Sequence, residues 1–74
     1  MAVTMARTIA EALKTAAITD TVSAVRLAAV ESLETRARNF GEVHAVHALY
    51  YVSREGAEDA QVAALQALFR LAQS

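Results

Sequence analysis

Both histidines and both tyrosines of the sequence lie in one short stretch, residues 43–55, which reads VHAVHALYYVSRE. If this stretch is a helix, His44, His47, Tyr51 and Arg54 follow one another at spacings of three, four and three, so they share one side. Tyrosine, histidine and arginine each combine an apolar body with a hydrogen-bonding tip. A stripe of such residues is typical of a contact surface, and we expect these four residues to touch a partner protein.

His44 and His47 also have a spacing that permits a shared metal ion, because imidazole is a good ligand for Zn, Cu and Ni. A zinc site needs three or four protein ligands, and the chain has no cysteine, so aspartate or glutamate would have to complete it. A di-metal carboxylate bundle needs a glutamate three positions before each histidine, where this chain has Gly41 and His44. We therefore expect no metal, and His44 and His47 are the candidate ligands of the metal-binding alternative.

Nucleophilic catalysis has little support in the sequence. There is no cysteine, and Ser23, Ser32 and Ser53 stand outside any recognisable nucleophile motif. The two histidines are the only plausible general bases, and a core this small leaves little room for a cleft. We expect neither an enzyme nor a bound cofactor.

The net charge of −1 argues against binding nucleic acid through global charge. A local basic strip of Arg26, Arg36 and Arg38 is the nucleic-acid-binding alternative, although Glu31 and Glu34 interrupt it. The apolar runs are far shorter than the roughly 20 residues of a membrane span, and residues 1–17 lack the apolar segment of a secretory signal. These features favour a cytoplasmic protein.

The pattern of apolar residues predicts an all-α fold. Hydrophobic residues make up 55% of the chain and proline is absent, so helix is favoured nearly everywhere. The apolar stripe changes direction near Asp20, near Asn39–Gly41 and near Gly56, which gives helices at about 4–17, 21–38, 41–55 and 57–72. At the second break, either Asn39 and Glu42 form a capping box or Gly41 ends the preceding helix. We expect one domain over residues 1–74, a small antiparallel bundle of four helices.

The large apolar residues on one side of each helix form the predicted core. Arg26 falls within the apolar arc of its helix, where we expect its stem to pack and its head to reach water, in preference to a buried ion pair. The predicted core consists of Met5, Ile9, Leu13, Val22, Val25, Leu33, Phe40, Val46, Leu49, Leu65 and Leu68.

A chain of 74 residues is close to the lower limit for a stable core without disulfides, metals or a partner. The apolar arc of the last helix covers about half its circumference, more than one core requires. We therefore expect a homodimer, and the same surface suits a different protein partner. The predicted interface comprises Val62, Leu65, Leu68, Phe69 and Leu71. The sequence thus favours a small protein–protein interaction module, such as a regulator, an adaptor, a chaperone or an accessory subunit.

Overall fold

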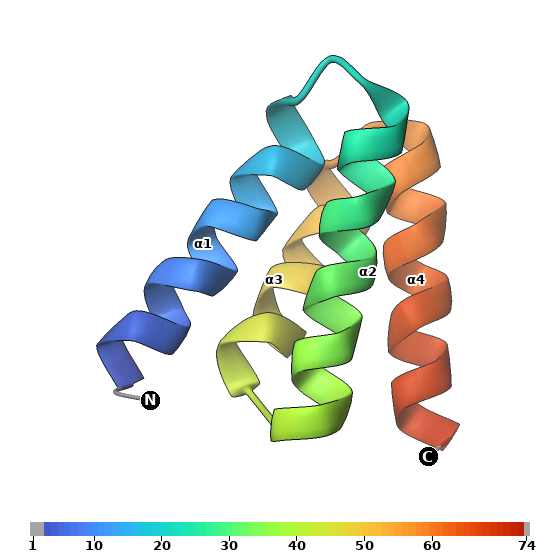
Figure 1. Ribbon diagram of the computed structural model, residues 1–74. Helices are drawn as coiled ribbons and strands as arrows, with labels where there is room; N and C mark the ends of the chain where they lie inside the picture. The colour runs from blue at the N-terminus through green and yellow to red at the C-terminus, as the bar shows by residue number, and fades with distance from the viewer. Residues whose placement is uncertain (1–2, 74) are drawn as a thin grey trace.

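A computed structural model describes residues 3–73 as four α-helices packed into a compact bundle (Figure 1). The helices are α1 (Val3–Thr19), α2 (Ser23–Phe40), α3 (Val43–Glu55) and α4 (Glu58–Gln73). The expected all-α fold of four helices is confirmed, and α1 and α2 extend slightly beyond their predicted ends. None of the described helices combines the length and the hydrophobicity needed to cross a bilayer.

The chain direction alternates from helix to helix, so α1 with α2 and α3 with α4 form two antiparallel hairpins (Figure 1). The helices α2 and α3 each pack against the other three helices and form the centre of the bundle. Towards its N-terminal end, α1 leans away from α2 (Figure 1). In this arrangement α4 packs against both α2 and α3.

The turn between α1 and α2 is closed by Asp20. One carboxylate oxygen of Asp20 accepts a hydrogen bond of 2.9 Å from the backbone N–H of Val22. This is a common way for aspartate to stabilise a turn. Val22 occupies the N-cap position of α2 and supplies no side-chain cap.

The turn between α2 and α3 depends on Gly41. Its φ of 60° lies in the left-handed region, and its N–H donates to the carbonyl of Ala37 at 3.0 Å. Glycine adopts this conformation without steric cost, so the prediction that Gly41 ends the helix is confirmed. The alternative capping box is wrong, because Asn39 lies within α2 and Glu42 pairs with Arg36.

The turn between α3 and α4 depends on Gly56 for a different reason. The backbone of Gly56 is extended, and its N–H donates to the carbonyl of Val52 at 2.9 Å. A Cβ atom at position 56 would lie 2.8 Å from the Val52 carbonyl oxygen and 3.5 Å from the Cβ of Ala60. The missing side chain therefore lets α4 start directly against the end of α3.

The core is made mainly of alanine. The large side chains that are fully buried are Leu33, Leu49 and Val52. The buried alanines are Ala10, Ala17, Ala29, Ala37, Ala45, Ala48, Ala60, Ala64 and Ala67. Small side chains let helix backbones approach closely, so these alanines face inward while many of the bulkier apolar residues face outward.

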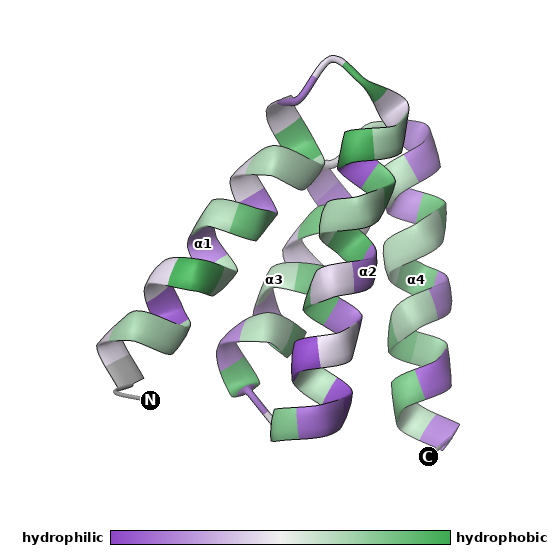
Figure 2. Ribbon diagram, viewed as in Figure 1, coloured by the Kyte–Doolittle hydropathy of each residue, from purple (hydrophilic) through white to green (hydrophobic). Residues whose placement is uncertain are grey.

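The predicted core is therefore only partly correct. Leu33 and Leu49 are buried as expected, while Ile9, Leu13 and Leu68 are half-buried. The prediction is wrong for six residues that are exposed, which are Met5, Val22, Val25, Phe40, Val46 and Leu65. Hydrophobic residues recur along all of α4 (Figure 2), so hydrophobicity alone does not tell which side of that helix faces inward.

Candidate protein-contact surface

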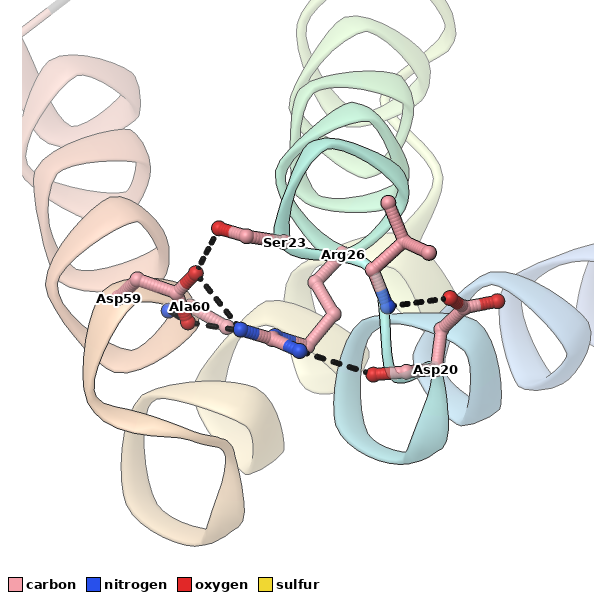
Figure 3. A network of polar contacts seen from close by, with 6 residues as sticks. Asp20, Ser23, Arg26, Asp59 and Ala60 are labelled. Atoms are coloured by element: carbon pink, nitrogen blue, oxygen red, sulfur yellow. Dashed lines mark hydrogen bonds and ion pairs between the residues drawn. The ribbon is translucent and has the colours of Figure 1, made fainter.

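One end of α4 is fixed to α2 by Asp59. Its carboxylate accepts hydrogen bonds from the Arg26 guanidinium at 3.0 and 3.3 Å and from the Ser23 hydroxyl (Figure 3). The backbone N–H of Ala60 donates to the same carboxylate at 2.7 Å. The hydrogen bonds from Arg26 and Ser23 lower the pKa of Asp59 to about 2.

Arg26 also corrects a prediction from the sequence. A third N–H of its guanidinium donates to the backbone carbonyl of Asp20 at 2.9 Å, on the opposite side from Asp59 (Figure 3). The side chain is 17% exposed. Its head is therefore held in an ion pair between α2 and α4, and does not simply reach water as the sequence suggested.

The other end of α4 is fixed to α2 by Glu34, whose side chain is only 7% exposed. Arg70 of α4 donates two hydrogen bonds to this carboxylate, at 2.7 and 2.8 Å, and Arg38 donates one at 2.6 Å. The hydrogen bonds from Arg70, followed by the one from Arg38, lower the pKa of Glu34 to about 2, despite the opposing effect of burial. The four-residue spacing of Glu34 and Arg38 is visible in the sequence. Nothing in the sequence indicates that Arg70, which lies 36 positions away, contacts Glu34.

The third arginine of the nucleic-acid-binding alternative also has a carboxylate partner. Arg36 donates to both oxygens of Glu42, at 2.9 and 3.0 Å. This pair joins the last turns of α2 to the start of α3. All three arginines of the proposed basic strip, Arg26, Arg36 and Arg38, are thus engaged with carboxylates of the same chain.

The ion pairs determine which side of α4 faces outward. Asp59 and Arg70 both reach α2, so the side of α4 that carries Leu65 and Phe69 points away from it, while Val62 lies at the margin, in a hollow that it shares with Leu27 of α2. All three of these side chains are exposed. Leu68 and Leu71, which the sequence also assigned to an interface, are half-buried against the core.

The neighbouring side of α3 continues this apolar surface. Tyr51 faces α1, because the ammonium group of Lys14 lies 4.6 Å from the centroid of its ring. Val46 and Tyr50 lie on the other side of α3, towards α4, and both are exposed. Since α3 and α4 run antiparallel from Gly56, Tyr50 comes level with the first half of α4 and Val46 with its second half. We call the set of Val46, Tyr50, Val62, Leu65 and Phe69 the hairpin face.

The aromatic residues show the same outward placement. The sequence has two phenylalanines and two tyrosines, and all four, Phe40, Tyr50, Tyr51 and Phe69, are exposed. Aromatic side chains contribute most when they are buried in a core or an interface. A folded chain that buries alanine and exposes its aromatic residues has its largest apolar groups available for contact with another molecule.

The stripe of His44, His47, Tyr51 and Arg54 is divided in the structure. His44 is half-buried, and the ring of Tyr51 lies beside Lys14 of α1. His47, Tyr51 and Arg54 line a hollow of about 290 Å³ together with Tyr50 and Glu55. Tyr50 therefore belongs both to this hollow and to the hairpin face, which makes the two regions continuous.

Within residues 3–73, no group of three or more histidine, cysteine, aspartate or glutamate side chains is placed to hold a metal ion.

The chain matches no protein-family model, and neither a curated protein nor a solved structure is significantly similar to it. Its function is therefore inferred from the residues and their geometry.

Proposed function

We propose that this protein is a small protein–protein interaction module that binds its partner through the hairpin face. The observation that supports this proposal is the exposure of Tyr50 on α3 and of Leu65 and Phe69 on α4, two helices that pack against each other. The role of the module would be that of a regulator, an adaptor, a chaperone or an accessory subunit.

Binding through the hairpin face is favoured energetically because it removes large apolar side chains from water. Burial of apolar surface contributes about 25 cal/mol per Å², so covering the exposed parts of these side chains favours association against the entropy that is lost on binding. Isolated exposed residues of this kind are normal, whereas contiguous apolar patches mark interaction sites. The members of the hairpin face are exposed on two helices that pack against each other, so one partner can cover them together.

The rigidity of the surface also favours binding. Ion pairs hold both ends of α4 on α2, and Gly56 holds the start of α4 against α3. A preformed surface loses less conformational entropy on association than a flexible one. Tyr50 and Phe69 are therefore suited to act as anchoring residues of an interface.

The hollow beside the hairpin face extends the proposed contact. His47, Tyr51 and Arg54 supply hydrogen-bonding groups at the edge of an apolar centre, as the rims of interfaces typically do. His44 belongs less directly to this surface because it is half-buried.

The nucleic-acid-binding alternative draws no support from Arg26, Arg36 and Arg38, because carboxylates of the same chain already neutralise them.

A second apolar region, near Phe40, lines a hollow of about 660 Å³ that also contains Arg36 and Glu42. A partner at that hollow would have to cover a charged pair, which costs desolvation energy. The uncharged hairpin face is the better candidate.

Site-specific photo-crosslinking in living cells tests this proposal. A photoreactive residue would replace Leu65, which is 56% exposed, or Val22, which is 52% exposed and lies before α2. We expect a protein adduct of defined mass from position 65 and none from position 22. Equal adducts from both positions, or none from position 65, would contradict the proposal.

A further inference from the structure

We infer that the partner of the hairpin face is a second copy of this chain, related to the first by a two-fold axis that runs along the helices. This inference rests on the proposed function, since it assigns an occupant to the same surface. The distribution of charged residues in and around the hairpin face supports a second copy as the partner.

The hairpin face itself contains no charged residue. In a symmetric contact, every charge meets the same set of charges from the second copy, so a surface with net charge tends to repel itself. Val46, Tyr50, Val62, Leu65 and Phe69 are all neutral. A partner of different sequence could complement a charged surface equally well, whereas a second copy favours a neutral one.

The turn end of the hairpin face carries one charge of each sign. Arg54 lies near the end of α3 and Glu58 begins α4, and both side chains are exposed. Arg54 lies four residues after Tyr50, and Glu58 lies four residues before Val62, so on their helices both are next to members of the hairpin face. The two charges therefore flank the same end of the neutral surface.

A two-fold axis parallel to the helices brings these charges together. Rotation about such an axis stacks the hairpins face to face, places α3 of each copy over α4 of the other, and leaves both turns at the same end. Arg54 of each copy then opposes Glu58 of the other, which gives two ion pairs across the interface. A two-fold axis perpendicular to the helices would place α3 over α3 and would not bring Arg54 near Glu58.

The size of the core gives a second reason for self-association. The buried core is mostly alanine and contains few large side chains, so the apolar area that one chain removes from water is small. A second copy is present wherever the chain is made. Stacking two hairpin faces would bury the exposed aromatic and aliphatic side chains of both copies in one new core.

Sedimentation velocity of charge-reversed variants tests this inference. Wild-type protein should be dimeric at micromolar concentration, and Arg54→Glu or Glu58→Arg should each raise the dimer dissociation constant by about tenfold or more, because like charges then face each other. An equimolar mixture of the two variants should restore dimers to within about threefold of the wild-type dissociation constant, since each mixed pair is again complementary. Far-UV circular dichroism checks that each variant is folded.

The mixture is the decisive sample. Arg54 also lies with its guanidinium 5.7 Å from the ring centroid of Tyr50, so Arg54→Glu alone loses more than a charge pair. Rescue by mixing cannot arise from that loss. Dimers that form but show no rescue would overturn the arrangement about this axis.

A wild-type chain that remains monomeric at millimolar concentration would overturn the second copy as partner. The proposed function fails independently, when the photoreactive residue at position 65 gives no protein adduct in cells. An adduct with the mass of two chains supports the inference, and an adduct with only a different protein overturns it while the proposed function stands.

Discussion

The buried carboxylate of Glu34 accepts two hydrogen bonds from Arg70, which lies on a different helix. Two parallel hydrogen bonds between a guanidinium and a carboxylate fix distance and orientation together. Together with the Arg26–Asp59 pair and the buried alanines of α4, this contact fixes the rotation of α4 about its own axis. It thereby decides which side of α4 faces the solvent.

Glu34→Gln should therefore destabilise the fold. The amide keeps the volume of the side chain but loses the charge that three guanidinium N–H groups share. We expect the free energy of unfolding to fall by roughly 1–3 kcal/mol, as for hydrogen bonds to charged groups. Urea denaturation followed by circular dichroism measures this, and Glu31→Gln is the matched control because Glu31 is exposed on the same helix. Equal effects of the two substitutions would contradict the role of Glu34.

The stability of the protein should depend on pH between about 5 and 2. The pKa values of Glu34 and Asp59 in the folded chain are about 2, below the values of about 4 that these side chains have when unfolded. The unfolded chain therefore binds more protons between these values, so the stabilisation is present above about pH 5 and is lost as the pH falls towards 2. Thermal melts at pH 7, 4 and 3 should show this loss, and Glu34→Gln should show a smaller one. A melting temperature that is constant from pH 7 to 3 would contradict these pKa shifts.

Gly56→Ala should destabilise the fold through a steric clash. The added Cβ would lie 2.8 Å from the carbonyl oxygen of Val52, and this backbone atom cannot move without disturbing the end of α3. We expect a cost of about 1–3 kcal/mol, comparable to other cases of overpacking. Gly41 provides the contrast, because no atom lies within 4 Å of its Cβ position and only its φ is unusual. Gly41→Asn should therefore be tolerated better than Gly41→Ala, while Gly56→Asn should be no better than Gly56→Ala.

The two adjacent tyrosines should behave differently. Tyr51 interacts with Lys14 of α1, so Tyr51→Ala should lower stability, with about 0.5–1 kcal/mol coming from the lost cation–π contact. Tyr50 belongs to the hairpin face, so Tyr50→Ala should weaken association more than it weakens the fold. Chemical denaturation and sedimentation velocity of both variants separate these effects. Identical behaviour of the two variants in both measurements would show that the faces of α3 are assigned incorrectly.

The helices could be predicted from the sequence because their breaks depend on local signals. Asp20, Gly41 and Gly56 each act within their own turn, through a side-chain hydrogen bond, a left-handed φ or a missing Cβ. The inward-facing sides could not be predicted in the same way. Alanine and the larger apolar residues both form stripes at helical spacing, and the choice between them depends on contacts between distant helices, such as Glu34 with Arg70.

The candidate surface was predicted only in part for the same reason. Val62, Leu65 and Phe69 were expected on an interface and are exposed, although Leu65 was also assigned to the core. Val46 was assigned to the core alone and is exposed. The stripe of His44, His47, Tyr51 and Arg54 follows helical spacing correctly. Its exposure nevertheless depends on α1, whose Lys14 reaches Tyr51 in a way that no local pattern indicates.

The claim that the hairpin face binds protein is tested most directly by affinity capture with two matched variants. Phe69 and Phe40 are 66% and 67% exposed, but only Phe69 lies on the hairpin face, whereas the ring of Phe40 lies 5.9 Å from the Arg36 guanidinium. Each tagged variant and the wild type would be used as bait in cells that also produce the untagged chain, and captured proteins would be quantified by mass spectrometry. We predict that wild type and Phe40→Asp retain the same partners, including the untagged chain, and that Phe69→Asp loses them. Retention of these partners by Phe69→Asp would contradict the claim.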